Sequence, residues 1–188
     1  MKRIKVVMHI SLDGFVAGRN GEMNWIKFDD QMFDFVNTFT DNADTALYGR
    51  ITWKMMDSYW PTAANKPNAS KHDKEHSLWY NSTDKIVLSN TMKGQHVDKT
   101  SFIGGDITPQ IKELKQNNGK DILIFGSPSV IRTLMKDNLI DDYWLFVNPI
   151  IFGQGISMFA KLDNRIELIH KTTKNFSCGV TAMHFTIG

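Results

Sequence analysis

The chain has 188 residues, of which 41% are hydrophobic and 22% charged, a composition typical of a globular protein with a sizeable core. It holds 22 Lys and Arg against 20 Asp and Glu, and the net charge of +2 argues against a nucleic-acid or membrane-surface protein. The single cysteine, Cys178, excludes an internal disulfide, and no apolar run approaches the roughly 20 residues needed to span a bilayer. We therefore expect one cytoplasmic domain over residues 1–188.

Strands and helices are predicted to alternate through the first half of the chain. Val and Ile dominate the first strand, and apolar residues at helical spacing follow Asp29 and Asp30. The polar stretch 61–76 contains two prolines and predicts a surface loop that enters a short helix. The predicted elements are strands over 3–12 and 43–49, and helices over 29–40, 50–59 and 74–79.

The second half continues the alternation and ends in strands. A glycine turn is expected over 102–106, and Gly119 is the expected C-cap of the helix before it. The predicted elements are strands over 85–90, 121–126, 141–155, 165–174 and 178–188, and helices over 107–118 and 127–138. The last two strands form an antiparallel pair, because the link between them is too short for a helical crossover. The whole pattern predicts an α/β fold with a largely parallel sheet.

Three predicted strand ends carry similar residues. They are Gly49, Arg50 and Thr52 after strand 43–49, Gly126, Ser127 and Ser129 after 121–126, and Ser89 and Asn90 at the end of 85–90. In a parallel sheet such ends lie along one edge, where open α/β folds bind ligands. Helix N-termini, glycines and an arginine suit phosphate, so the set indicates a ligand with several phosphates, such as a dinucleotide.

Each junction also has a plainer explanation. A glycine there is commonly only a turn residue, and a Ser or Thr commonly caps the helix. The usual dinucleotide fingerprint G-x-G-x-x-G and the Walker A loop are both absent from the sequence. His72 and His76 have the spacing of metal ligands, but they lie in a polar stretch and predict a solvated helix face. No metal site is expected.

Several segments resemble dihydrofolate reductases, and more closely the reductase domain of the bifunctional deaminase-reductase of riboflavin biosynthesis and its stand-alone relatives. These segments are "MHISLDGFVAG", "GEMNWIKFDD", "ALYGRITWKMMDSYW", "VLSN", "IFGSPSV" and "NPIIFGQGISMF". The resemblance covers most of the chain. It implies a dihydrofolate reductase-like fold, with a central mostly parallel mixed sheet of about eight strands and flanking helices. It also implies NADPH, a pterin- or aminopyrimidine-like small-molecule substrate and a homodimer.

The resemblance implies roles for individual residues. The residues matched to the cofactor are Val16, Ala17, Gly49, Arg50, Thr52, Ser89, Asn90, Gly126, Ser127, Ser129 and Val130. Gly126-Ser127 matches a glycine pair that carries a strained cis peptide in the family. Asp30 matches the active-site carboxylate when counted from Trp25, whereas counting from the helix phenylalanine selects Asp29. An Asp in an apolar cleft beside Trp25 and Phe33 would have a raised pKa and could assist protonation of the substrate.

The sequence departs from the family pattern on the substrate side. Reductases of dihydrofolate have a Thr on a later strand, where this chain has Phe146, Val147 and Asn148, and a tyrosine near the nicotinamide is replaced by Ile131. These departures keep open a second class, a pterin- or nucleotide-binding module without turnover. A third class, a structural dimer partner with an empty cleft, is disfavoured by the retained Gly49-Arg50-x-Thr52 set.

Overall fold

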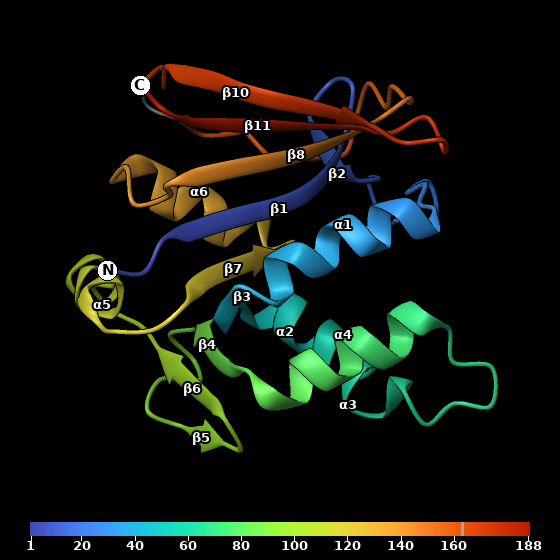
Figure 1. Ribbon diagram of the computed structural model, residues 1–188. Coiled ribbons are helices and arrows are strands. Elements are labelled where there is room, and N and C mark those ends of the chain that lie inside the picture. Colours follow the sequence, from blue (N-terminus) through green and yellow to red (C-terminus); the bar gives the residue numbers. More distant parts are fainter. Residues whose placement is uncertain (163) are drawn as a thin grey trace. The chain divides into compact units, whose positions relative to one another are not determined.

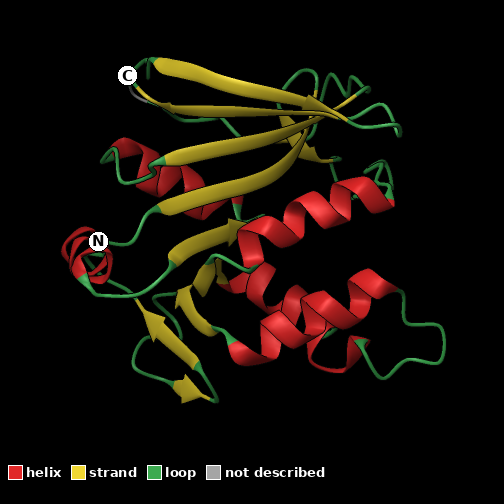
Figure 2. Ribbon diagram, in the orientation of Figure 1, coloured by secondary structure: helices red, strands yellow, loops and turns green. Residues whose placement is uncertain are grey.

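In the computed structural model the chain divides into two compact units. The structure describes residues 1–162 and 164–188. The first unit comprises Met1–Lys2 and Asp30–Leu123, and the second comprises Arg3–Asp29 and Ile124–Gly188. Each unit contains both strands and helices (Figures 1 and 2). Within the described ranges, no helix combines the length and the apolar content needed to cross a bilayer.

The first unit is built on parallel strands. Its strands are β3 (Ala43–Gly49), β4 (Asp84–Leu88), β5 (His96–Val97), β6 (Thr100–Ile103) and the first part of β7 (Asp121–Phe125). Their order is β7-β3-β4-β6-β5, and only β5 is antiparallel to its neighbour. Gly49 is paired with Leu88, so the carboxyl ends of β3 and β4 lie side by side.

The helices of the first unit are α1 (Asp30–Thr40), α2 (Arg50–Asp57), α3 (Trp60–Ala63), α4 (Lys71–Ser82) and α5 (Thr108–Gln116). α1 buries Met32, Val36 and Phe39, and its other side contacts α4. α4 begins earlier than predicted because Ser70 and Asp73 form a capping box, in which each side chain accepts a backbone N–H of the other residue. The segment expected to be a loop is therefore half helical.

The second unit combines one parallel pair with an antiparallel hairpin. Its main strands are β1 (Ile4–Ser11), β8 (Asp142–Asn148), β10 (Leu168–Asn175) and β11 (Thr181–Ile187), in the order β10-β11-β8-β1. β1 and β8 are parallel, whereas β11 is antiparallel to both β8 and β10, which confirms the predicted antiparallel pair. A bulge interrupts β10 between His170 and Thr172. Helix α6 (Pro128–Lys136) buries Val130 and Ile131.

Most differences from the sequence-based expectation are short strands that were not predicted and one predicted strand, 141–155, that is too long. Residues 141–155 do not form one strand, because β8 ends at Asn148 and Pro149 cannot donate a backbone hydrogen bond. The glycine turn at 102–106 is preceded by β6, and the loop after β1 contains β2 (Phe15–Ala17). β2 pairs with β9 (Ile156–Ser157) in a separate two-stranded sheet.

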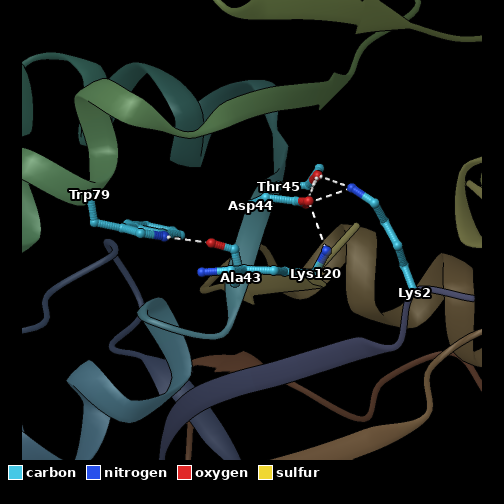
Figure 3. A network of polar contacts seen from close by, with 6 residues as sticks. All are labelled: Lys2, Ala43, Asp44, Thr45, Trp79 and Lys120. Atoms are coloured by element: carbon cyan, nitrogen blue, oxygen red, sulfur yellow. Dashed lines mark hydrogen bonds and ion pairs between the residues drawn. The ribbon is translucent and has the colours of Figure 1, made fainter. Parts of the chain in front are cut away.

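Gly119 has a different role from the one predicted. The C-cap of α5 is Asn117, and Gly119 lies beyond it with φ 141°, next to the Asp44 carboxylate and Lys2. A side chain at this position would displace both of them. Figure 3 shows the network: the Lys2 ammonium lies 2.5 Å from Asp44 Oδ1 and 2.9 Å from Thr45 Oγ1, and the Lys120 N–H donates to Asp44 Oδ2. The glycine therefore makes room for a partly buried ion pair.

Candidate active site

The junction between β3 and α2 places a cation directly after a strand end. Gly49 is the N-cap of α2, with φ −83° and ψ 157°, and Arg50 is its exposed first residue. Thr52 lies inside the helix, so the alternative that it caps α2 is wrong. Gly49 at the end of β3 pairs with Leu88 at the end of β4. The residues that come next in the chain, Arg50 and Ser89, therefore start from neighbouring positions of the sheet edge.

Hydroxyls and a second cation gather after β4. Ser89 Oγ lies 3.2 Å from Thr91 Oγ1, and a Cβ placed on Gly105 would lie 3.4 Å from Lys93 Nζ. Together with Arg50 these side chains form what we call the β3–β4 polar set: Arg50, Ser89, Thr91 and Lys93. The set holds two cations and two hydroxyls, and this donor chemistry fits a phosphate group.

Asn90 supports the β3–β4 polar set from within the protein. Its Oδ1 accepts the Gly105 N–H at 2.7 Å, and a Cβ on Gly104 would lie 2.6 Å from the same oxygen. The glycine pair Gly104-Gly105 therefore lets the turn after β6 close onto Asn90. The sequence reasoning named Asn90 but missed this partner, although the adjacent glycines were a visible signal.

The junction between β7 and α6 has an unusual backbone. Gly126 has φ 68° and Ser127 has φ 59° and ψ 59°, so both residues are left-handed. The expected cis peptide is wrong: every peptide bond that the structure describes is trans, and the turn is made by positive φ angles instead. Ser127 is buried and forms no side-chain cap, Ser129 is exposed, and Val130 is buried.

A carboxylate organises the loops of the second unit. Asp13 accepts hydrogen bonds from Ser11 Oγ at 2.6 Å, from the Gly153 N–H at 2.7 Å and from the Phe152 N–H at 3.1 Å. The Ser11 hydroxyl, with the Gly153 and Phe152 N–H groups, holds the pKa of Asp13 below its ordinary value. The sequence analysis missed Asp13, although it stands in the quoted "SLDG".

Val16 and Ala17 lie on the element that Asp13 helps to fix. Both are buried, and Ala17 pairs with Ile156 of β9. Any Cβ at Gly155 would collide with the Ala17 carbonyl, so this glycine is required for the close approach of the two strands. Val16 and Ala17, which by resemblance match the family's nicotinamide loop, therefore lie in a short strand, β2, that pairs with β9.

The two candidate carboxylates have different surroundings. Asp29, in the second unit, accepts hydrogen bonds from Ser177 Oγ at 2.7 Å and from the Cys178 N–H at 3.0 Å. Asp30 is the exposed first residue of α1. A carboxylate held by its own chain is less able to bind a substrate, and this contrast favours Asp30 as the reactive group.

Asp30 and Phe33 line one pocket of the first unit, of about 410 Å³, which we call the α1–α4 pocket. Its lining residues are Asp30, Phe33, Asp34, Ser70, Lys71, His72 and Glu75. The Phe33 ring stacks on His72, with centroids 3.9 Å apart and planes 11° from parallel. Six of its seven lining residues are polar or charged, so charged groups surround Asp30 in this pocket.

Trp25 belongs to the second unit, where it meets aromatic and backbone partners. Its ring contacts Phe152 edge-on at 5.3 Å, and its Nε1–H donates to the Glu22 carbonyl at 3.0 Å. Among the residues matched to the substrate side, the structure brings Asp30 and Phe33 together in one unit and Trp25 and Asp29 in the other.

Asn148 stands among the positions compared with the family threonine. Its Oδ1 accepts the Lys27 N–H at 2.9 Å, and its Nδ2 lies 3.0 Å from the Phe146 carbonyl and 3.2 Å from His9 Nδ1. Burial lowers the pKa of His9 to about 4, so this histidine is neutral at physiological pH. The side chain of Asn148 is therefore used to join loop and strand.

His72 and His76 do not form a solvated helix face, and that prediction is wrong. His76 is only 5% exposed, and its ring lies 4.1 Å from Trp60 and 5.1 Å from Trp79. Burial, with His72 nearby, lowers the pKa of His76 to about 3. The polar sequence concealed the burial because α3 folds back onto α4.

A larger cavity, of about 550 Å³, lies elsewhere in the first unit. It is lined by Ala43, Asp44, Trp79 and Lys120 among others, and Figure 3 shows these residues around the Lys2 ion pair. Ala43 begins β3 and Gly49 ends it, so the cavity is at the strand end opposite to the β3–β4 polar set. Size alone therefore does not identify the cofactor site.

Known proteins resemble this chain over nearly its whole length. The uncharacterized protein YyaP of Bacillus subtilis (strain 168) is 34% identical over 183 residues, which are 95% of this chain and 92% of YyaP. A crystal structure from Shewanella sp. PV-4, of a protein assigned to riboflavin biosynthesis, matches with a TM-score of 0.77 at 20% identity, covering 100% of this chain and 99% of that one.

Dihydrofolate reductase from Enterococcus faecalis, complexed with NADP(H), matches with a TM-score of 0.60 at 13% identity and covers 99% of this chain and 96% of its own. These structural matches confirm the dihydrofolate reductase-like fold predicted from the sequence. The model of the RibD C-terminal domain family matches residues 2–182, and the chain therefore belongs to that family.

Proposed function

We propose that the protein is an NADPH-dependent reductase of a pterin- or aminopyrimidine-like small molecule, with a reaction like that of 5-amino-6-(5-phosphoribosylamino)uracil reductase or of dihydrofolate reductase. Membership of the RibD C-terminal domain family supports the reaction class. The observation that carries the proposal is the β3–β4 polar set, in which Arg50 and Ser89 follow from the paired residues Gly49 and Leu88. Its two cations and two hydroxyls suit the 2′-phosphate of NADPH.

The residues after β4 favour NADPH over NADH. Folds specific for NAD place an acid at the corresponding strand end, where it bonds the ribose 2′-hydroxyl and would repel a phosphate. Here the segment Ser89–Lys93 contains no carboxylate. Gly49, Thr52 and Asn90 complete this end of the proposed cofactor site.

Residues of the second unit are also proposed to bind the cofactor. Val16 and Ala17 match the family's nicotinamide loop, Gly126 and Ser127 match its glycine pair, and Ser129 and Val130 match the helix that faces the pyrophosphate. When bound, NADPH supplies the hydride. Asp30 would bind an amidine group of the substrate ring or assist its protonation, and Phe33, on the same helix, would contact that ring. By resemblance to the riboflavin-type reductases, we propose a homodimer.

Paired titrations of NADPH and NADH test the cofactor. One charged hydrogen bond of about 1.5–3 kcal/mol corresponds to about a 10- to 150-fold preference for NADPH at low salt. The preference should shrink at high salt because the contact is electrostatic. Equal affinities at low salt would contradict the 2′-phosphate assignment, and tighter NADH would reverse it.

The Asp30→Asn variant tests the chemistry. We expect it to lose NADPH oxidation with dihydropterin or aminopyrimidine substrates and to keep the wild-type affinity for NADPH, because Asp30 is not in the polar set. Asp29→Asn is the matched variant, and we expect it to retain turnover. Full activity in Asp30→Asn together with loss in Asp29→Asn would transfer the role to Asp29.

A second candidate function is a nucleotide- or pterin-binding module without turnover. The engagement of Asn148 with Lys27, Phe146 and His9 favours it, since that side chain is already bonded within the protein. NADPH binding without oxidation by any pterin or aminopyrimidine would support the module and contradict the reductase.

A further inference from the structure

We propose that the α1–α4 pocket selects its substrate by charge, accepting a neutral or amine-bearing pterin or aminopyrimidine and disfavouring a phosphorylated one. The inference rests on the proposed function, because it takes Asp30 as the group that meets the substrate. It goes beyond that function by separating this chain from reductases whose substrate carries a phosphoribosyl group.

Carboxylates dominate the lining of the pocket. Asp30, Asp34 and Glu75 face a single cation, Lys71. The Lys71 ammonium lies 2.6 Å from Asp34 Oδ1 and 3.9 Å from Glu75 Oε1, so it is already paired inside the pocket. The lining therefore has two more negative than positive charges, and its cation is committed to its own chain.

His72 does not supply a second cation. Its burial lowers the pKa, an effect that outweighs the nearby carboxylates of Asp73 and Glu75. The imidazole is therefore neutral at physiological pH and, stacked on Phe33, presents a flat uncharged ring. A planar heterocycle fits beside such a stack, but an anion gains nothing from it.

The N-terminus of α4 does not compensate for the missing charge. A helix N-terminus usually attracts phosphate through its unpaired N–H groups. In α4, Ser70 Oγ already accepts the Asp73 N–H at 3.0 Å, and the Asp73 carboxylate accepts the Ser70 N–H at 2.9 Å. The capping box thus uses the site that a phosphate would need and adds a further negative charge near it.

The energetic consequence is repulsion of a substrate phosphate. A phosphate monoester carries close to two negative charges, and the pocket that would hold it is lined by Asp30 and Asp34 of α1 and Glu75 of α4. We expect about a tenfold or greater loss of affinity on phosphorylation of an otherwise identical substrate at low salt. Salt should reduce this difference.

Two matched compounds test the inference: 5-amino-6-(ribosylamino)uracil and its 5′-phosphate. Their affinities are measured by calorimetry with NADP⁺ present, and their turnover by NADPH oxidation. We expect the unphosphorylated compound to bind more tightly and to give the higher kcat/KM. Asp34→Asn removes a charge and releases Lys71, so it should narrow the gap by raising affinity for the phosphate ester.

Glu113→Gln is the control, because it makes the same charge change at an exposed position of α5. It should leave the ratio of the two affinities unchanged, and melting curves check that all variants fold. Equal or tighter binding of the phosphate ester to the wild type, with turnover, overturns the charge selection and leaves the proposed function intact. If neither compound binds while NADPH does, the proposed function fails, and the inference fails with it.

Discussion

Two strand-to-helix junctions of this protein share a residue pattern but differ in backbone and charge. Both read glycine, two residues, then a hydroxyl: Gly49 to Thr52 in the first unit and Gly126 to Ser129 in the second. Gly49 has an extended conformation that any residue can adopt, whereas Gly126 and Ser127 are both left-handed. A similar residue pattern therefore has an ordinary backbone at one junction and a left-handed backbone at the other.

The junctions also differ in electrostatics. Arg50 begins α2, whereas Pro128 begins α6 and no charged side chain accompanies Gly126 through Ser129. A dinucleotide has a highly charged phosphate end and a nicotinamide end with little charge. The proposed 2′-phosphate contact therefore belongs to the junction that carries Arg50, and each prediction below changes one side of the comparison.

The largest expected effect is the loss of Arg50. We expect Arg50→Ala to weaken NADPH binding by about 10- to 150-fold, in line with a charged hydrogen bond of about 1.5–3 kcal/mol. The melting curve should not change, because the side chain is exposed. Titration followed by fluorescence measures the affinity. An unchanged affinity would show that Arg50 is only a surface charge and would remove the electrostatic contrast.

The next largest expected effect is a difference in thermal stability between variants of Gly126 and Gly49. Gly126→Ala forces a Cβ into the left-handed region, at a cost of about 1–2 kcal/mol, which lowers Tm by about 2–8 °C in a chain of this size. Gly49→Ala introduces no such strain and should lower Tm less. Thermal unfolding of both variants measures the difference. Equal decreases in Tm would mean that the left-handed backbone is not why Gly126 is needed.

Hydroxyl deletions should give smaller effects. Thr52→Ala and Ser129→Ala each remove one neutral donor, worth about 0.5–1.5 kcal/mol, or about 2- to 13-fold in NADPH affinity. Both effects should persist at high salt, in contrast to that of Arg50. If either variant binds NADPH as the wild type does, that hydroxyl does not contact the cofactor.

The smallest expected effect is on the stability of the protein at acid pH, through Asp13 in the loops of the second unit. Hydrogen bonds from Ser11 and from the Gly153 and Phe152 N–H groups lower the folded-state pKa of Asp13, so the group stabilises the fold above its unfolded pKa of about 3.9. This stabilising contribution of Asp13 is lost as pH falls through its folded-state pKa, which lies below the unfolded value.

We expect Asp13→Asn to reduce stability at neutral pH and to flatten the dependence of stability on pH below about 5. Denaturant unfolding at several pH values measures it, with Asp137→Asn as a variant outside these loops. An identical pH dependence in wild type and Asp13→Asn would show that the carboxylate is not linked to folding.

The sequence predicted the elements that have a strong local residue pattern. It missed the short strands that form only by pairing with a distant part of the chain. The strand at 43–49 and the helix after it have the predicted start and order, because a short apolar run that ends in glycine and the helical spacing that follows it are both local patterns. β2, β5 and β9 have two or three residues each and no local pattern, so they form only where another strand is available. Asp13 was missed for the same reason, since two of its donors lie about 140 residues away.

The candidate site residues were named mainly through the family resemblance, and their roles stay predictions. The backbone at Gly126-Ser127 was not, because nothing in the letters G-S-P distinguishes a cis peptide from two left-handed residues. The polarity of the α1–α4 pocket was also not predictable, since Asp30 and Phe33 come from one helix while Lys71, His72 and Glu75 come from another.

Strand β10 also affects how the protein behaves at high concentration. It is the last strand of its sheet, and the side chains from Ile169 to Thr173 are all exposed. An open strand edge is a template on which another chain can add a strand and start aggregation. The bulge between His170 and Thr172 breaks the regular ladder of that edge, and Lys171 places a charge within it. These two features make the edge a poorer template for an added strand.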